Sequence, residues 1–159
     1  MVDDPTSETL MVVEKPEGVL PVPITLGDCQ ILLVEDGPDS QQLTVHILKK
    51  AGARVIVADN GQTGVEKAMA ARSAGRPFDV ILMDMQMPVM DGYEATSQLR
   101  AAGYDGPVIA LTAHAMATDR DRCLNAGCDD HISKPIDRHA LLTAISSHLR
   151  AVTSSPAHK

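Results

Sequence analysis

Five reactive side chains stand at the ends of four separate apolar segments of the sequence. Two adjacent carboxylates follow the first segment, and a carboxylate, a hydroxyl and an ammonium group follow the others: Glu35, Asp36, Asp84, Thr112 and Lys134. Three carboxylates that lie close together repel one another and raise one another's pKa. A hard divalent cation such as Mg²⁺, which takes oxygen ligands, removes that conflict. If the segment ends meet, these residues form a magnesium site with an ammonium group beside it.

The predicted site suits the transfer of a phosphoryl group onto one of its carboxylates. A carboxylate that faces a cation and a fixed ammonium group can attack phosphorus, and Asp84 is the predicted nucleophile. Asp36 and Asp84 would hold the metal, with Glu35 behind them.

The remaining groups would bind the oxygens of the transferred group. Lys134 would grip the phosphoryl group, while the Thr112 hydroxyl and the Ala113 N–H would bind its other oxygens. Each residue alone is a weak signal, because acidic residues often follow strands and a Lys-Pro pair is usually a turn. The placement of all five at the ends of apolar segments is much harder to explain by chance.

The elements that must position these residues alternate regularly along the chain. The expected strands are 30–34, 54–58, 80–84, 108–111 and 129–133, and the expected helices are 39–51, 62–73, 92–102, 115–125 and 137–151. Alternation of this kind predicts an α/β fold with a parallel five-stranded sheet and helices on both faces. The carboxyl ends of parallel strands share one edge of the sheet, and ligands bind just beyond that edge.

The expected domain leaves a short segment at each end of the chain. Residues 1–28 contain four prolines and six acidic residues, which is typical of a flexible tail or linker. Residues 29–151 form the predicted domain, and residues 152–159 are predicted to be a frayed tail. Nothing in the sequence repeats at the period of the strands and helices.

Composition excludes several classes of function. The chain of 159 residues has a net charge of −7 and only three aromatic residues, which disfavours nucleic-acid binding. No stretch approaches the roughly 20 apolar residues of a membrane span, and the N-terminus lacks the basic start of a signal peptide. Cys29, Cys123 and Cys128 are expected to be reduced thiols of a cytoplasmic protein. Neither of the last two forms a zinc-like ligand set with His131.

Four motifs together resemble the receiver domain of two-component response regulators. They are Leu33–Asp36, Met83–Gly92, Ala110–Ala113 and Ser133–Ile136. The resemblance covers residues 29–151, and the motif sequences are most similar to those of receivers joined to hybrid histidine kinases. It implies a flavodoxin-like fold with strand order 2-1-3-4-5.

The resemblance also implies a function. A receiver takes a phosphoryl group from the phosphohistidine of a histidine kinase or a histidine phosphotransfer protein, here onto Asp84. The resemblance implies Mg²⁺ ligands in Asp36, Asp84 and the Gln86 carbonyl, and a cis bond before Pro135. The expected partners are therefore proteins, with no direct contact to nucleic acid.

Three positions bear on the readout and lifetime of the phosphorylated state. The switch aromatic of the family corresponds to His131, which puts its coupling to Thr112 in doubt and could make the readout depend on pH. Gln86 and His114 stand where the resemblance implies tuning of dephosphorylation. The alternative for His131 is a side chain that simply fills the same slot. The alternative for His114 is a side chain that faces solvent.

Other functions remain open from the sequence. An aspartyl-phosphate phosphatase of the haloacid dehalogenase type would have a second Asp where this chain has Gln86. A nucleotide-binding domain would have a glycine-rich loop after the first strand, and none is present. An inactive receiver used as a scaffold would not need the five reactive residues. The chain could be free-standing or a part of a hybrid kinase.

Overall fold

The computed structural model describes residues 25–87, 89–113 and 117–157. Within these residues five strands alternate with five helices. The strands are β1 (Gln30–Val34), β2 (Arg54–Ala58), β3 (Val80–Asp84), β4 (Val108–Thr112) and β5 (Asp130–Ser133). The helices are α1 (Pro38–Lys50), α2 (Gly61–Ser73), α3 (Gly92–Ala101), α4 (Ala117–Ala126) and α5 (Arg138–Ala157). The predicted alternation is confirmed.

All neighbouring strands run parallel, in the order β2-β1-β3-β4-β5. The predicted flavodoxin-like order is therefore confirmed, with β5 at one edge. The register pairs Val34 with Met83, Asp84 with Leu111, and Thr112 with Ser133. Because the strands are parallel and in step, their carboxyl ends meet at one edge of the sheet.

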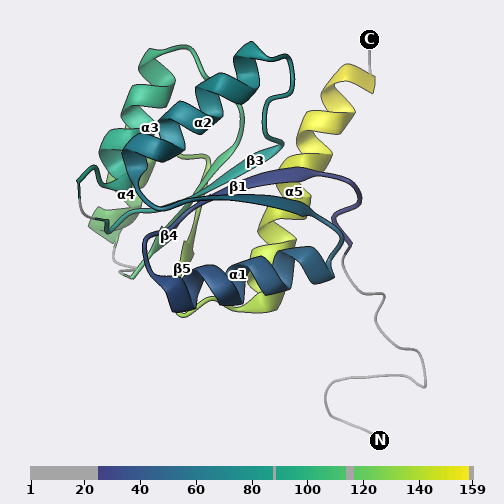
Figure 1. Ribbon diagram of the computed structural model, residues 1–159, viewed down its shortest axis with the longest axis horizontal. Coiled ribbons are helices and arrows are strands. Elements are labelled where there is room, and N and C mark those ends of the chain that lie inside the picture. The colour runs from purple at the N-terminus through teal and green to yellow at the C-terminus, as the bar shows by residue number, and fades with distance from the viewer. Residues whose placement is uncertain (1–24, 88, 114–116, 158–159) are drawn as a thin grey trace, which may run out of the picture.

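Helices cover both faces of the sheet, as Figure 1 shows. One buried cluster joins the sheet to α1 and α5 through residues such as Ile47, Leu48, Leu141 and Ile145. A second joins the opposite face to α2, α3 and α4. The central strands β1 and β3 are buried along almost their whole length. Strands covered on both sides read as continuous apolar runs, which is why these segments are recognisable in the sequence.

The face of α1 that packs on the sheet differs from the predicted stripe. Spacing of four residues predicts that Leu43 faces the core with Ile47 and Ala51, but the Leu43 side chain is 49% exposed. Thr44 and Leu48 are buried instead. A step of four residues turns 40° past one full turn of an α-helix, so three such residues spread over 80° and the first of them, Leu43, lies off the buried face. Because Thr44 is polar, the buried face of α1 does not appear as a continuous apolar stripe in the sequence.

The described structure extends beyond the predicted limits of the domain at both ends. Leu26 is buried in the cluster with α1, and its N–H donates to the Ala51 carbonyl at 2.8 Å. At the other end α5 continues to Ala157, past residue 151. The remainder of the predicted N-terminal tail, residues 1–24, lies outside the described residues.

Close contacts fix the helices and loops around the carboxyl edge of the sheet. A Cβ at Gly64 in α2 would lie 2.7 Å from a methyl of Val34, so only glycine lets α2 pack this closely on β1. The Asp91 side chain accepts from the Glu94 N–H at 2.9 Å and caps α3 just after the loop that follows Asp84. These contacts hold the loops that surround the strand ends.

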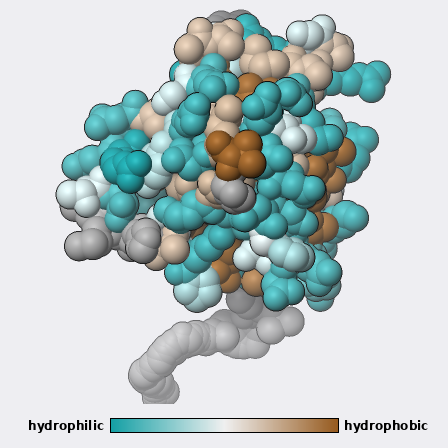
Figure 2. Space-filling model, turned by 60° about the vertical axis from the view of Figure 1, so that its left-hand side comes forward, coloured by the Kyte–Doolittle hydropathy of each residue, from teal (hydrophilic) through white to brown (hydrophobic). Residues whose placement is uncertain are grey.

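The molecular surface is mainly polar in the view of Figure 2, with hydrophobic residues in small separate patches. The exposed large hydrophobic side chains in the described parts of the chain are Leu43, Ile56, Val89 and Leu124. None of the helices described here is both long and apolar enough to cross a lipid bilayer.

Candidate functional site

The three predicted carboxylates converge at the carboxyl edge of the sheet. Glu35 and Asp36 follow β1, Asp84 ends β3, and one ligand atom of each lies within 4.8 Å of the other two. Glu35 and Asp84 are buried, whereas Asp36 is exposed. The cluster therefore has two carboxylates shielded from water and a third open to it.

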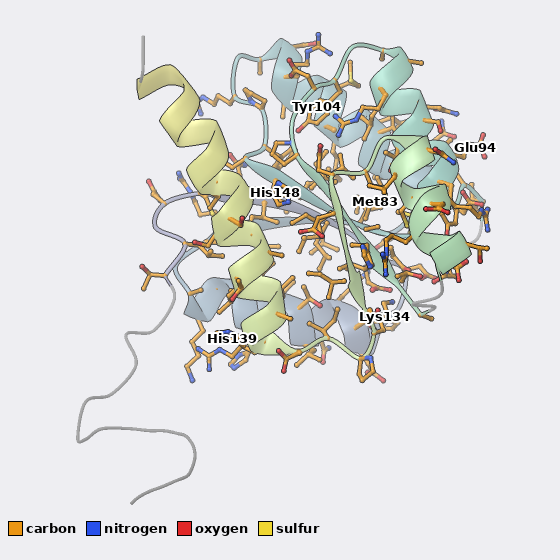
Figure 3. All side chains as sticks on the ribbon, turned by 180° about the vertical axis from the view of Figure 1, so that it is seen from behind. Met83, Glu94, Tyr104, Lys134, His139 and His148 are labelled. Atoms are coloured by element: carbon orange, nitrogen blue, oxygen red, sulfur yellow. The ribbon has the colours of Figure 1, made fainter. Side chains whose placement is uncertain are left out.

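Lys134 reaches the same cluster from the loop after β5. Its Nζ lies 2.9 Å from Glu35 Oε1 and 3.3 Å from Asp84 Oδ2. Figure 3 shows Lys134 at the end of the sheet where α1 begins. The Lys134–Pro135 bond is cis, as the resemblance to receiver domains implies. Burial lowers the pKa of Lys134, but the hydrogen bond to Glu35 and the charge of Asp84 outweigh it and raise the pKa. Lys134 therefore stays in its ammonium form.

The electrostatics of Asp84 favour a cation at this site. Burial and the neighbouring Glu35 side chain together raise the pKa of Asp84 to about 7, although the Gln86 N–H and the charge of Lys134 oppose the shift. The Gln86 N–H donates to Asp84 Oδ1 at 3.1 Å. A single ammonium group thus fails to offset the burial and crowding of the carboxylates. The hard oxygen donors of Glu35, Asp36 and Asp84 fit Mg²⁺.

Addition of Mg²⁺ is expected to raise the stability of the chain. Binding to the folded state alone contributes about 2.7 kcal/mol at a concentration 100 times the dissociation constant. Thermal unfolding with Mg²⁺ and with a chelator measures this difference. An Asp36→Asn protein should lose most of the shift, whereas Asp39→Asn, which changes a nearby exposed carboxylate, should keep it. An unchanged melting temperature in saturating Mg²⁺ would contradict the metal site.

The groups predicted to bind phosphoryl oxygens lie on the adjacent strand. Thr112 ends β4 and is buried, and its carbonyl accepts from the Lys134 N–H at 2.7 Å. This bond ties the loop that carries Lys134 to the end of β4. The next residue, Ala113, is exposed, and its N–H donates to Gln86 Oε1 at 3.2 Å. The structure brings these four residues to the carboxyl edge that carries Asp84.

The predicted switch residue His131 is separate from the carboxylate cluster. His131 lies in β5, half-buried and in register with Ala110. It does not belong to the carboxylate cluster found among the described residues. His114 lies outside the described residues.

Two contacts at the site have no signal in the sequence. The Gln41 side chain of α1 donates to the Glu35 carbonyl and, at 3.1 Å, to Asp59 Oδ1, and so ties the loops after β1 and β2 together. The Gln86 side-chain oxygen accepts the N–H of Ala113. A polar residue near a strand end is common, and only the register of the strands shows which partner it reaches.

A shallow cavity of about 510 Å³ opens beside the site. It is lined by Met85, Gln86, Met87, Asp91, Tyr93, Asp119 and Arg122. The Arg122 guanidinium lies 3.9 Å from the centre of the Tyr93 ring, a cation–π contact between two residues that line the cavity.

Comparison with known proteins gives a consistent result. Residues 31–146 match the response regulator receiver domain family. The chain is 40% identical over 114 residues to the two-component response regulator ORR41 of Oryza sativa subsp. japonica, covering 70% of this chain and 87% of that protein. It is 36% identical over 155 residues to histidine kinase 1 of Arabidopsis thaliana, covering 77% of this chain. That match spans only 13% of the kinase.

Solved structures agree with the fold. The receiver domain of sensor histidine kinase PA1611 from Pseudomonas aeruginosa PAO1 is described with a magnesium ion coordinated in its active site cleft. It is 40% identical, with a TM-score of 0.65, and the match covers 77% of this chain and 98% of that one. The receiver domain of Saccharomyces cerevisiae Ssk1, solved in complex with the histidine phosphotransfer protein Ypd1, is 28% identical with a TM-score of 0.68. That match covers 77% of this chain and 89% of that one.

The family match accounts for the geometry better than the phosphatase or nucleotide-binding alternatives. It covers the carboxylates, the lysine and the threonine at the strand ends in one arrangement. The chain belongs to the response regulator receiver domain family of two-component signalling.

Proposed function

We propose that the chain accepts a phosphoryl group on Asp84 from a phosphohistidine, in a reaction that requires Mg²⁺. The observation that carries this proposal is the contact of Lys134 Nζ with both Glu35 and Asp84 inside a cluster of three carboxylates. A buried nucleophile, a fixed cation and a metal-ligand set at one strand edge suit attack on phosphorus.

The residues of the chain have distinct roles in the proposed transfer. A carboxylate oxygen of Asp84 forms a bond to phosphorus as the phosphorus–nitrogen bond of the donor breaks, and the electron pair of that bond stays on the imidazole. Lys134, Thr112 and the Ala113 N–H bind the phosphoryl oxygens. Asp36, Asp84 and the Gln86 carbonyl would hold Mg²⁺, with Glu35 behind them. Mg²⁺ bound there would neutralise charge that develops on those oxygens.

The proposed donor is a histidine kinase or a histidine phosphotransfer protein. The Ssk1 receiver was solved with such a phosphotransfer protein, and several similar curated proteins are hybrid or sensor histidine kinases. Because the match spans a small part of those kinases, a place within a hybrid kinase is part of the proposal. Phosphorylation would then change the affinity for partners, with Thr112 and His131 as the proposed switch residues. Gln86 and His114 are proposed to tune the loss of the phosphoryl group.

The whole chain incubated with acetyl phosphate and Mg²⁺ is expected to gain one phosphoryl group on Asp84. Intact-protein mass spectrometry measures the gain, and reduction of the acyl phosphate with borohydride before digestion marks the modified residue. The gain should disappear with a chelator and should be labile to base. Modification of another residue, or none with Mg²⁺ present, would exclude the proposed function.

A further inference from the structure

The Gln86 side chain occupies a hydrogen-bond donor that the phosphoryl group would need. Its Oε1 accepts from the Ala113 N–H at 3.2 Å, and this N–H is a proposed ligand of a phosphoryl oxygen. We propose that Gln86 competes with the phosphoryl group for the Ala113 N–H, so that the resting chain caps its own anion site. This inference rests on the proposed function and adds a resting-state competitor to it.

The backbone around the site sets up this contact. The Met85 N–H donates to the Leu111 carbonyl at 2.9 Å, which extends the β3–β4 pairing beyond the strand ends. The Gln86 N–H then donates to Asp84 Oδ1 at 3.1 Å. These two bonds fix the start of the Gln86 side chain opposite the residue that follows Thr112. The glutamine oxygen is a neutral stand-in for one phosphoryl oxygen.

The contact is reversible because of its surroundings. Gln86 is exposed, and its side chain also lines the cavity of about 510 Å³ beside the site. That space can take the side chain after it leaves the Ala113 N–H. The backbone of Gln86 need not move, so its carbonyl and its bond to Asp84 can stay in place. Capping by the side chain is therefore separable from the proposed role of the backbone in metal binding.

Removal of the competing oxygen is expected to strengthen binding of a phosphoryl mimic. A single neutral hydrogen bond of this kind corresponds to an affinity change of about 2- to 10-fold. We expect Gln86→Ala and Gln86→Met to bind trifluoroberyllate, in the presence of Mg²⁺, more tightly than the unchanged chain by that factor. Methionine is nearly as long as glutamine but has no oxygen acceptor, so it separates the hydrogen bond from bulk.

The measurement is calorimetric titration of each whole chain with trifluoroberyllate at saturating Mg²⁺. This equilibrium is independent of the rate at which a phosphorylated chain is hydrolysed. Gln98→Ala, which removes an exposed glutamine from α3, serves as the matched control and should bind as the unchanged chain does. Amide hydrogen exchange without the mimic provides a second readout. The Ala113 N–H should exchange faster in both Gln86 variants.

The outcomes separate the inference from the function on which it rests. If the unchanged chain binds no trifluoroberyllate, the proposed function fails. If it binds, but both Gln86 variants show the same affinity as the unchanged chain, competition is excluded while the function stands. If only the alanine variant binds more tightly, bulk and not hydrogen bonding is responsible, and the inference fails. Unchanged exchange of the Ala113 N–H in both variants would also overturn it.

Discussion

An Asp84→Asn protein is expected to accept no phosphoryl group and, without Mg²⁺, to be more stable than the unchanged chain by about 1–3 kcal/mol. The first effect follows because the amide is not a nucleophile toward phosphorus. The second follows because Asp84 is 2% exposed and crowded by Glu35, so its ionised form is costly to bury. Asparagine keeps the shape and removes the charge, and Lys134 keeps its bond to Glu35.

The gain in stability should depend on pH in a defined direction. The pKa of Asp84 in the folded chain is raised from 3.8 to about 7, so between these values the folded state holds a proton that the unfolded state has lost. The stability contributed by this group therefore falls as the pH rises through that interval. The advantage of Asp84→Asn should be largest above about pH 7 and should shrink toward pH 4.

Chemical denaturation in a chelator across this pH range measures the difference. Asp105→Asn, which changes an exposed loop carboxylate, is the matched control and should show no such trend. Added Mg²⁺ should narrow or reverse the gap, because it stabilises the unchanged chain and has one ligand fewer in the variant. Equal stability of the two proteins above pH 7 in a chelator would show that the carboxylates do not oppose one another. Phosphoryl uptake by the variant would exclude Asp84 as the acceptor.

Much of the fold can be predicted from the sequence because its strands are buried on both faces. Such strands appear as apolar runs of four or five residues, and the reactive residues stand directly at their ends. Once the sheet is parallel, the convergence of Asp84, Thr112 and Lys134 follows from topology alone. The sequence therefore predicts which of these side chains the fold brings together, while their roles stay predictions.

The sequence predicts poorly where contacts depend on side-chain direction. Leu43 and Leu48 are the same residue type on one helix, yet Leu43 is exposed and Leu48 is buried, because a helix turns 100° at each residue. The capping of Ala113 by Gln86 joins two residues that are 27 apart in the chain and depends on the offset between β3 and β4. Neither the spacing nor the type of the residues in the sequence indicates that offset.

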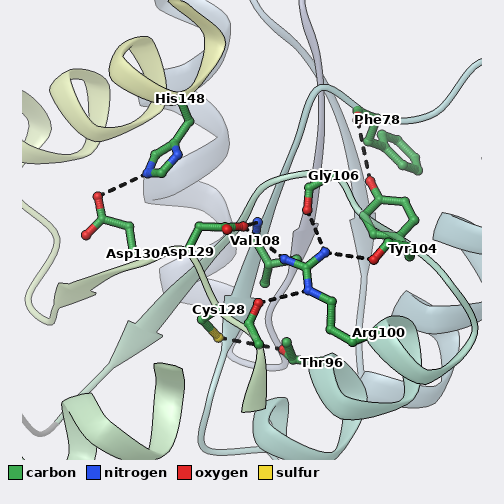
Figure 4. A network of polar contacts seen from close by, with 11 residues as sticks. Phe78, Thr96, Arg100, Tyr104, Gly106, Val108, Cys128, Asp129, Asp130 and His148 are labelled. Carbon is green, nitrogen blue, oxygen red and sulfur yellow. Dashed lines mark hydrogen bonds and ion pairs between the residues drawn. The ribbon is translucent and has the colours of Figure 1, made fainter. Parts of the chain in front are cut away.

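Arg100 illustrates the same limit on a larger scale. In Figure 4 its guanidinium lies between the loop after α3 and the loop before β5. It donates to the carbonyls of Gly127, Tyr104 and Gly106 at 2.9, 2.8 and 2.8 Å, and to Asp129 Oδ2 at 2.9 Å. In the sequence it is one of several arginines on helices. In the fold it joins the loop before β4 to the loop between α4 and β5.

Arg100→Ala is expected to destabilise the chain by about 3 kcal/mol, a large part of the stability of a domain of this size. Three carbonyls lose a charged donor, and Asp129 loses the partner that shares its oxygen with the Val108 N–H. The ion pair itself contributes little, since Asp129 is 42% exposed. The main loss is therefore in the hydrogen bonds to the loop carbonyls.

Urea denaturation of Arg100→Ala, Arg100→Lys and Arg120→Ala tests this assignment. Lysine keeps the charge but cannot reproduce the planar fork of donors, so it should recover less than half of the loss. Arg120 is exposed on α4 and serves as the matched control, with an expected change within about 0.5 kcal/mol. If Arg100→Lys were as stable as the unchanged chain, charge and not the network of carbonyl contacts would hold these loops together. If Arg100→Ala were equally stable, the loops would be fixed by the packing of Leu99 and Tyr104 beneath them.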